Sequence, residues 1–153
     1  MFHVKHIKCL FWMKLAFMGE IFHNIHMKKF TSKTQKVGEL GENLAVKYLK
    51  NKGFSIIERN FTFQGGEIDI IAEQNNTLFF VEVKTRNYKN TPLDKISEYK
   101  PEENVTPKKR ERFEKTVALY EGSHDVEKYE SIKLVCMAVY ISGKDVRVDM
   151  IDF

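Results

Sequence analysis

The sequence predicts an α/β fold with one mixed, five-stranded sheet flanked by helices, its elements in the order αβββαββ. Two segments carry apolar residues at three- and four-residue steps, which is typical of amphipathic helices. Five shorter segments are rich in β-branched and aromatic residues and are bounded by turn-forming residues. The 153 residues, 42% hydrophobic and 30% charged, suffice for one soluble domain with a core and are too few for two.

The first helix is predicted over residues 33–52. Its apolar stripe consists of five residues at helical spacing: Leu40, Leu44, Ala45, Tyr48 and Leu49. Gly53 is a natural stop, because glycine accepts the left-handed cap conformation without a steric penalty. Gly38 and Gly41 lie in the first half of the helix, where each costs up to roughly 1 kcal/mol relative to alanine. We therefore expect another element to pack close to the backbone there.

Three strands are predicted to follow as a meander over residues 54–86. A Gly-Gly pair at 65–66 and an Asn-Asn pair at 75–76 separate them, since both pairs favour tight turns. Residues 87–105 hold two prolines and scattered charge without any period, so this stretch is predicted to be a long flexible loop.

The second helix is predicted to begin at Thr106, a capping residue, with Pro107 in its first turn and Tyr120 near its end. Its start is basic, with the sequence KKRER. The last two strands, at 131–141 and 145–153, flank a Ser-Gly-Lys turn and are expected to form a hairpin.

Residues 1–32 are interpreted as an N-terminal extension, and residues 33–153 as the single domain. Lys14 divides the most apolar window of the extension, which leaves no signal-peptide core and nothing near the roughly 18 apolar residues of a membrane span. Met27 resembles an ordinary protein start, so whether residues 1–26 belong to the native protein stays open.

Charge and cysteine content limit the classes of partner and compartment. The formal net charge of +4 permits a polyanionic partner without requiring one. Only two cysteines are present, which excludes a disulfide framework and predicts a reducing, cytoplasmic location. No membrane partner is expected. Each of two histidine pairs in the extension, His3 with His6 and His23 with His26, has a spacing of three residues, and we interpret these histidines as incidental surface residues.

Acidic residues interrupt the two apolar strands that are predicted on either side of the Asn-Asn turn. If that turn has two residues, paired positions sum to 151, which places Asp69 opposite Glu82 and Glu67 opposite Lys84. Carboxylates that face each other across a sheet repel, and a divalent cation is a natural compensation. Glu42, at the edge of the first helix's apolar stripe, would reach this cluster if that helix packs across the meander.

Both polar segments also have a simpler interpretation. The sequence EVK along a strand is most often a solvated face with cross-strand ion pairs, and KKRER is often a salt-bridged helical face. The metal interpretation gains support because the two strands beside the Asn-Asn turn are apolar enough to be central strands. A charge in a central strand has to be paired or to coordinate a ligand.

Three blocks carry a resemblance to a known family: GELGENLAVKYLKNKGFSIIERNF, GGEIDIIAEQNNTLFFVEVKTR and VTPKKRERF. With them, residues 36–153 resemble the YraN-like family (uncharacterised protein family 0102), a bacterial group within the PD-(D/E)XK, or restriction-endonuclease-like, superfamily. The strand after the second helix reads VCMAV, where family members commonly carry RFDVV, which weakens any role for that strand in the site. The loop at 87–105 is also longer and more acidic than usual.

The resemblance implies a restriction-endonuclease-like core and roles for individual residues. The implied metal ligands are the side chains of Asp69 and Glu82 and the backbone carbonyl of Val83, with Glu42 and Glu67 as further candidates. Lys84 would be the catalytic lysine, so the implied catalytic set is Glu42, Asp69, Glu82 and Lys84. Glu42 is similar to the helical glutamate of archaeal Holliday-junction resolvases. Lys109 matches a lysine that the family places at the start of the second helix, where it would meet a phosphate.

The first functional hypothesis is a metal-dependent endonuclease that uses Mg²⁺ or Mn²⁺ to hydrolyse phosphodiester bonds in nucleic acid. DNA is the expected substrate, and the choices between DNA and RNA and between linear and branched substrates stay open. The basic residues expected to contact the nucleic acid are Lys108, Lys109, Arg110 and Arg112. The alternative is a nucleic-acid-binding module that keeps the fold without cutting. A third hypothesis, a protein-interaction domain, rests on the aromatic residues Phe11, Trp12, Phe17 and Phe22. No small-molecule cofactor is expected, and a homodimer stays open because junction-cleaving relatives often pair.

Overall fold

The computed structural model describes residues 13–14, 32–89, 91–96 and 106–152, and all structural statements concern these residues. Their elements are β1 (Met13–Lys14), α2 (Lys33–Asn51), β2 (Ser55–Phe63), β3 (Gly66–Gln74), β4 (Thr77–Asn87), the 3₁₀ helix η1 (Leu93–Lys95), α3 (Pro107–Glu121), β5 (Ser131–Ser142) and β6 (Asp145–Asp152). Within this part of the chain, none of the helices has both the length and the apolar character that crossing a membrane requires.

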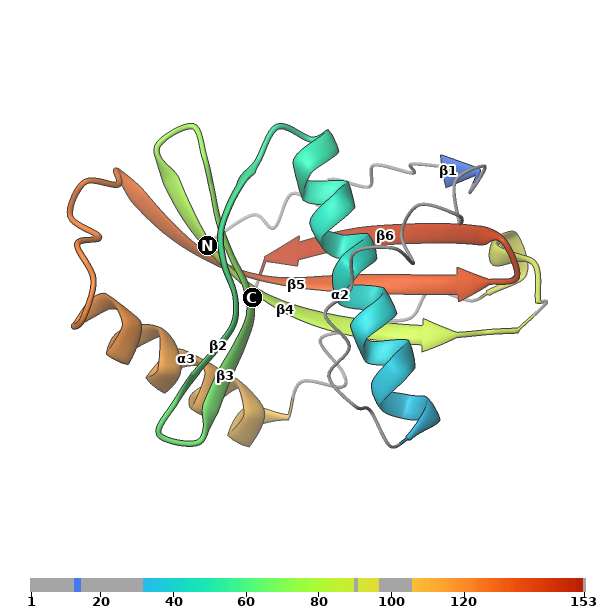
Figure 1. The fold of residues 1–153 in the computed structure, drawn as a ribbon, viewed down its shortest axis with the longest axis horizontal. Coiled ribbons are helices and arrows are strands. Elements are labelled where there is room, and N and C mark those ends of the chain that lie inside the picture. Colours follow the sequence, from blue (N-terminus) through green and yellow to red (C-terminus); the bar gives the residue numbers. More distant parts are fainter. Residues whose placement is uncertain (1–12, 15–31, 90, 97–105, 153) are drawn as a thin grey trace, which may run out of the picture.

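The described strands form one mixed sheet in the order β1-β6-β5-β4-β3-β2 (Figure 1). Neighbouring strands are antiparallel except β4 and β5, which are parallel and are joined through α3. The predicted α/β class, with a mixed sheet flanked by two helices, is therefore confirmed. β1 adds a sixth strand inside the predicted extension, because two residues are too few to produce a periodic signal in the sequence.

The prediction of a long loop over residues 87–105 is wrong in part. Leu93 opens η1 and is only 3% exposed, because it packs against Ala138 and Tyr140 of β5. Apolar contacts made by one leucine leave no periodic trace in a segment rich in charge and proline, so the sequence could not predict this short helix. Positions 97–105 lie outside the described residues.

The helix α2 covers one face of the sheet and packs mainly on β4. Its start is fixed by a capping box, in which the Ser32 hydroxyl accepts from the Gln35 backbone N–H and the Gln35 side chain accepts from the Ser32 N–H, each at 3.2 Å. Its buried residues join apolar side chains of β3, β4 and β5 in one core, which includes Leu44, Leu49, Ile70, Val81 and Val83.

The two glycines of α2 differ in their surroundings. A Cβ atom on Gly41 would lie 1.7 Å from Thr85 Oγ1, so the helix backbone contacts β4 with no room for a side chain. The expected close approach is thus confirmed at Gly41. It is wrong at Gly38, where a Cβ would meet nothing within 4 Å.

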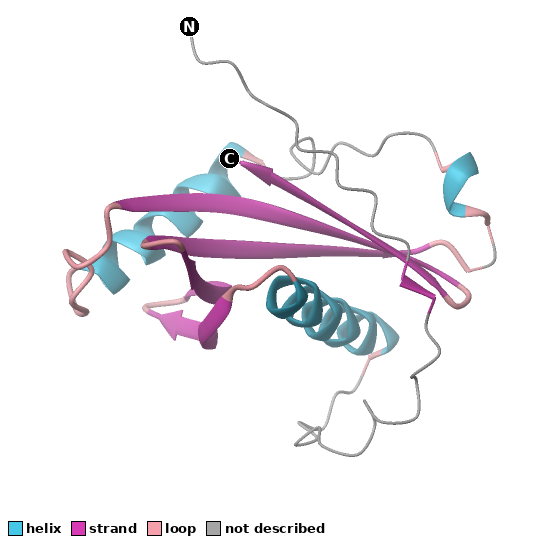
Figure 2. Cartoon of the chain, turned by 90° about the horizontal axis from the view of Figure 1, so that it is seen from above, coloured by secondary structure: helices cyan, strands magenta, loops and turns pink. Residues whose placement is uncertain are grey.

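The helix α3 lies on the opposite face of the sheet from α2 and packs on β3 and β2 (Figures 1 and 2). Phe113, Val117 and Tyr120 pack there against Ile68 and Ile71, in a second core. A Cβ on Gly66 would lie 1.8 Å from Thr116 Oγ1, so the start of β3 rests directly on α3.

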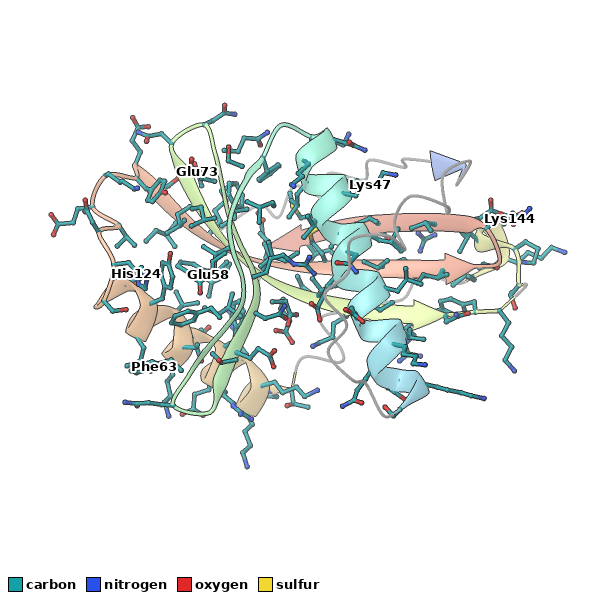
Figure 3. All side chains as sticks on the ribbon, in the orientation of Figure 1. Lys47, Glu58, Phe63, Glu73, His124 and Lys144 are labelled. Carbon is teal, nitrogen blue, oxygen red and sulfur yellow. The ribbon has the colours of Figure 1, made fainter. Side chains whose placement is uncertain are left out.

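The sheet divides between β3 and β4, and this division positions the candidate site. Regular pairing of β3 with β4 runs from Gln74↔Thr77 to Ile70↔Val81, while β2 stays paired with β3 as far as Phe63↔Gly66. The β2–β3 hairpin therefore leaves the rest of the sheet as an arm that runs across it (Figure 1). Phe63 lies at the tip of this arm on the side of α3 and is 46% exposed (Figure 3).

The two glycines of α2 allow a matched test of the helix contact. We expect Gly41→Ala to lower the free energy of unfolding by about 1–3 kcal/mol, because the new methyl group overlaps Thr85. Gly38→Ala should instead raise it by up to about 1 kcal/mol, since alanine is the better helix former and the space is open. Urea unfolding of both variants measures the difference, and equal effects would contradict the close contact.

Candidate functional site

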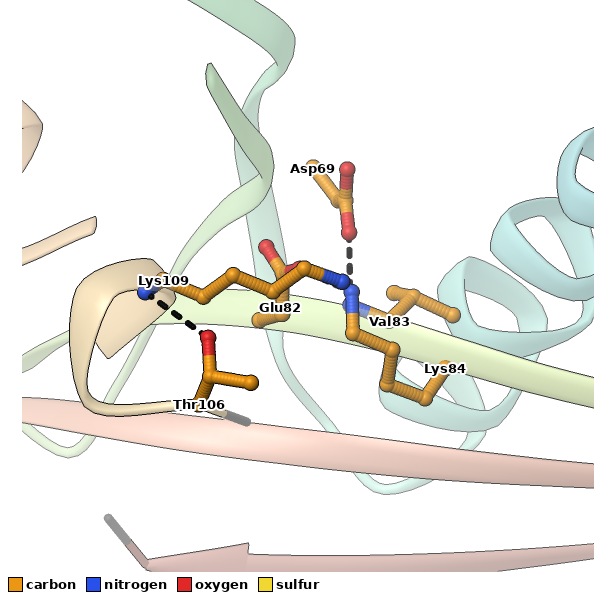
Figure 4. Close-up of polar contacts among 6 residues, drawn as sticks. All are labelled: Asp69, Glu82, Val83, Lys84, Thr106 and Lys109. Atoms are coloured by element: carbon orange, nitrogen blue, oxygen red, sulfur yellow. Dashed lines mark hydrogen bonds and ion pairs between the residues drawn. The ribbon is translucent and has the colours of Figure 1, made fainter. Parts of the chain in front are cut away.

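The candidate site lies at the fork where β3 leaves β4. The Asp69 side chain accepts a hydrogen bond through Oδ2 from the Val83 backbone N–H at 2.6 Å (Figure 4). This carboxylate takes the place of a strand carbonyl, so the Val83 N–H stays satisfied after the strands part. Because the N–H and C=O of one strand residue point to the same side, the Val83 carbonyl also faces the fork.

Glu82 and Lys84 flank Val83 on the other face of β4. They are two residues apart and share a face, and the Lys84 ammonium donates to Glu82 Oε1. Both are partly buried, with 21% of the Glu82 side chain and 25% of the Lys84 side chain exposed. The structure therefore brings Asp69, Glu82 and Lys84 together around one backbone position, as the sequence predicted.

Burial makes this group of charges electrostatically unusual. Burial, followed by the nearby charge of Glu82, raises the pKa of Asp69 from its usual 3.8 to about 7, although the bond from Val83 opposes the rise. Burial also lowers the pKa of Lys84, but the charge and hydrogen bond of Glu82 and the charge of Asp69 outweigh it. The pKa of Lys84 therefore lies above its usual value, and its side chain is charged at neutral pH.

Glu42 reaches the neighbourhood of the fork from α2, as the sequence suggested. It is half-buried, and its charge contributes to the raised pKa of Asp69. Burial raises the pKa of Glu42, and the charge of Glu67 adds to this rise. Arg59 on β2 opposes it through an ion pair of 3.7 Å between its Nη2 and Glu42 Oε2.

Glu67 does not lie where the sequence predicted. The register sum of 151 is confirmed for the paired residues of β3 and β4, but the pairing ends at Ile70↔Val81. Neither Asp69 with Glu82 nor Glu67 with Lys84 forms a regular pair, because β3 has turned away to follow α3. Glu67 instead pairs with Thr62 of β2 and is exposed.

The carboxylate oxygens of Asp69 and Glu82 at the fork are of the chemical kind that binds divalent cations. Two carboxylates lie close together at partly buried positions, and oxygen ligands of this kind are those that Mg²⁺ and Mn²⁺ take. The described residues contain no group of three or more His, Cys, Asp or Glu side chains arranged to hold a metal ion. Any ion at the fork would thus depend on two carboxylates, with the Val83 carbonyl and water completing its coordination.

The basic start of α3 contains an ion pair, as a salt-bridged helical face would, and also exposed basic side chains, as a nucleic-acid-binding surface would. The Thr106 hydroxyl caps the helix by accepting from the Lys109 N–H at 3.3 Å. Arg110 and Glu114 form an ion pair of 2.8 Å, which agrees with a salt-bridged face. Lys108, Lys109 and Arg112 are exposed and form no ion pair with acidic side chains of the described residues. Figure 4 shows the Lys109 side chain extending from α3 toward the fork.

A separate polar cavity of about 500 Å³ lies at the far end of the β3–β4 hairpin. Its lining residues are Gly53, Ser55, Glu73, Gln74, Asn75, Asn76 and Tyr129. The Tyr129 hydroxyl donates to Glu73 Oε2 at 2.6 Å, so the carboxylate in this cavity already has a partner. The cavity contains none of the predicted site residues.

Sequence analysis missed Arg59, which forms an ion pair with Glu42, and its neighbour Asn60, whose side chain favours the charged form of Glu42. Their only signal was a polar interruption, ERN, in the apolar strand β2. Without knowing that α2 crosses β2 near this point, the interruption could equally have been a solvent-facing segment.

The described residues define an α/β protein with two carboxylates and a lysine at the fork of a mixed sheet. The chain belongs to Uncharacterised protein family UPF0102, whose family model matches residues 41–153, which confirms the family resemblance. A UPF0102 protein of Flavobacterium psychrophilum is 39% identical over 113 residues, which cover 74% of this chain and 87% of that protein. One of Caldanaerobacter subterraneus is 35% identical over 126 residues, with coverage of 82% and 95%. One of Campylobacter jejuni is 39% identical over 101 residues, with coverage of 65% and 81%.

The raised pKa of Asp69 predicts a pH-dependent cost in stability. Between its usual pKa of 3.8 and about 7, the folded protein holds a proton that the unfolded chain has lost, so stability falls as pH rises through this window. We expect Asp69→Asn, which keeps an acceptor for Val83, to raise the free energy of unfolding at pH 8 by about 1–4 kcal/mol.

Urea unfolding at pH 4.5 and pH 8 measures this effect, and the gain should shrink toward the lower pH. Asp145→Asn is the matched control, because Asp145 is exposed. If Asp69→Asn raised the free energy of unfolding equally at both pH values, this rise would not come from the charge of Asp69.

Proposed function

We propose that this protein is a metal-dependent endonuclease of the PD-(D/E)XK, restriction-endonuclease-like type, which hydrolyses phosphodiester bonds in DNA, including branched DNA. The observation that carries the proposal is the group at the fork: a partly buried Asp69 beside Glu82, with Lys84 two residues further along β4. This spacing agrees with the motif that the sequence resembles.

Each residue of the fork has a distinct task in this proposal. Asp69 and Glu82, with the Val83 carbonyl, would hold Mg²⁺ or Mn²⁺. When bound, such an ion supplies a more acidic water and neutralises charge on the phosphate. The bond from the Val83 N–H to Asp69 fixes the orientation of that carboxylate. The charged Lys84 orients a water or neutralises the charge that builds on a phosphate oxygen, and its raised pKa makes it unsuited to accept a proton at neutral pH.

Burial of Asp69 also distinguishes the proposal from a solvated strand face. Two exposed carboxylates on such a face would keep pKa values near their usual range, since water screens them. At the fork, the Asp69 carboxylate is partly removed from water and lies beside a second acid, and Lys84 offsets only part of the repulsion. A bound cation relieves this cost, which gives the arrangement a chemical purpose.

We expect Lys84→Ala to reduce metal-dependent cleavage at least 100-fold, the usual contribution of a positioned catalytic group. The full chain is incubated with linear, single-stranded and four-way-junction DNA, with Mn²⁺ or with chelator. Lys89→Ala, which alters an exposed lysine just beyond β4, is the control and should cut like the wild type. Cleavage that persists in chelator, or equally in Lys84→Ala, would exclude the proposed chemistry.

The second candidate, a nucleic-acid-binding module that does not cut, is favoured by the exposed basic start of α3. This module would bind DNA equally well in chelator and cleave none of these substrates. The nuclease, by contrast, should bind Mn²⁺ through Asp69 and lose this binding in Asp69→Ala. The same incubation, combined with a metal titration, therefore separates the two functions.

Both candidates predict a phosphate contact at α3. Replacing Lys108, Lys109 and Arg112 by alanine should weaken DNA binding and lower the slope of log affinity against log salt by about 0.9 for each lost phosphate contact on duplex DNA. Fluorescence anisotropy at several salt concentrations measures this slope. A control variant with Lys89, Lys133 and Lys144 replaced removes the same charge elsewhere. An equal loss of slope in the control would mean that only net charge matters.

A further inference from the structure

Phe63 is the only phenylalanine, tyrosine or tryptophan that is exposed among the described residues. It is 46% exposed at the tip of the β2–β3 arm, where it pairs with Gly66 of β3 (Figure 3). A single exposed apolar residue is common on protein surfaces and by itself indicates no function. The surroundings of Phe63, by contrast, match one kind of ligand.

The side chain of Phe63 lies on the face of the arm that rests on α3. Residues two apart on a strand share a face, and Phe61 packs edge-to-face on Tyr120 of α3, with ring centroids 5.1 Å apart. Opposite Phe63, Gly66 has no side chain, because Thr116 of α3 occupies the space that its Cβ would need. The cross-strand partner therefore leaves the ring of Phe63 uncovered.

Basic side chains of α3 lie beside both the fork and the tip of the arm. Lys109 extends toward the fork (Figure 4). Arg112 lies beside the turn of the arm, where a Cβ on Gly65 would be 3.9 Å from Arg112 Nη2. Both are exposed, and neither forms an ion pair with an acidic side chain of the described residues. The start of α3 thus offers positive charge at both ends of a path from the carboxylates to Phe63.

The tip of the arm is close to the candidate site along β3. Gly66, the partner of Phe63, is three residues before Asp69, which corresponds to about 10 Å at the usual rise of a strand. A stacked nucleic-acid strand advances by about 3.4 Å per nucleotide, so a base at Phe63 would be roughly three nucleotides from a phosphate at the fork. One strand of nucleic acid therefore spans both places.

We infer that Phe63 stacks on an unpaired base of DNA, while the basic side chains at the start of α3 hold the adjoining phosphates. Positive charge beside an exposed aromatic ring is the combination with which proteins bind single strands without reading their sequence. In a duplex, neighbouring base pairs already cover the faces of the bases, so the ring selects DNA that has a single-stranded segment. The inference rests on the proposed function for the cleaved bond near this base, and it narrows the substrate class of that function.

DNA binding in chelator tests the inference without relying on cleavage. Fluorescence anisotropy gives the affinity of the full chain for a single-stranded oligonucleotide and for a blunt duplex of the same length. We expect Phe63→Ala to weaken single-strand binding about 10-fold and duplex binding by no more than about 2-fold, the loss of one base–aromatic stack. Phe63→Tyr keeps an aromatic ring and should bind both forms like the wild type.

Ile57→Ala is the matched control, because Ile57 is an apolar residue of the same strand and is 42% exposed. It should leave the affinity for both forms of DNA unchanged. Tryptophan fluorescence reports the stacking itself, since a nucleobase on the face of an indole ring quenches its emission. Trp12 is the only tryptophan of the chain, so single-stranded DNA should quench Phe63→Trp more strongly than it quenches the wild type or Ile57→Trp.

Three results would overturn the inference while leaving the proposed function intact. They are equal losses of single-strand and duplex affinity in Phe63→Ala, a loss as large in Ile57→Ala, and no added quenching in Phe63→Trp. If the wild type binds single strands through Phe63 but cleaves no DNA with Mn²⁺, the endonuclease proposal fails, and the stacking role of Phe63 stands without a cleaved bond beside it. A wild-type chain that binds neither form of DNA would refute both.

Discussion

The hydrogen bond from the Val83 N–H to the Asp69 carboxylate is the contact on which the architecture around the site depends. When β3 leaves β4, the backbone groups of β4 lose their partners, and an unsatisfied buried N–H would be costly. Asp69 meets this need with a side chain, so the β2–β3 arm can turn onto α3, where Gly66 allows contact with Thr116. The fork and the acidic group are therefore products of the same contact.

The same contact concentrates unfavourable electrostatics in a small region. Asp69 is held beside Glu82 with little access to water, Glu42 adds a further negative charge, and Lys84 compensates in part. In a structural ion pair, each charged group is usually stabilised by its partner. In this group, by contrast, one carboxyl has a pKa near neutrality. Perturbed carboxyl groups of this kind concentrate at functional sites, which is the physical basis for assigning chemistry to the fork.

Much of the local structure was predictable from residue patterns. The register sum of 151 was correct from Ile70 to Gln74, because a two-residue turn fixes strand pairing near it. The extension of that register to Glu67 was wrong, since the pattern of β3 carries no sign of the point at which it separates from β4. The close contact expected at Gly41 occurs, while a Cβ on Gly38, for which the sequence made the same prediction, would meet nothing within 4 Å.

The sequence by itself determined the order of α2, β2, β3, β4, α3, β5 and β6, the β3–β4 turn, and the spacing of Glu82 and Lys84 on one face of β4, because these follow from local periodicity and turn chemistry. Only the tertiary structure decided where the sheet divides, which glycine contacts a strand, and that Arg59 meets Glu42. Those features arise from packing between segments distant in the chain, and such packing depends on the shapes of both partners, which no local pattern of residues records.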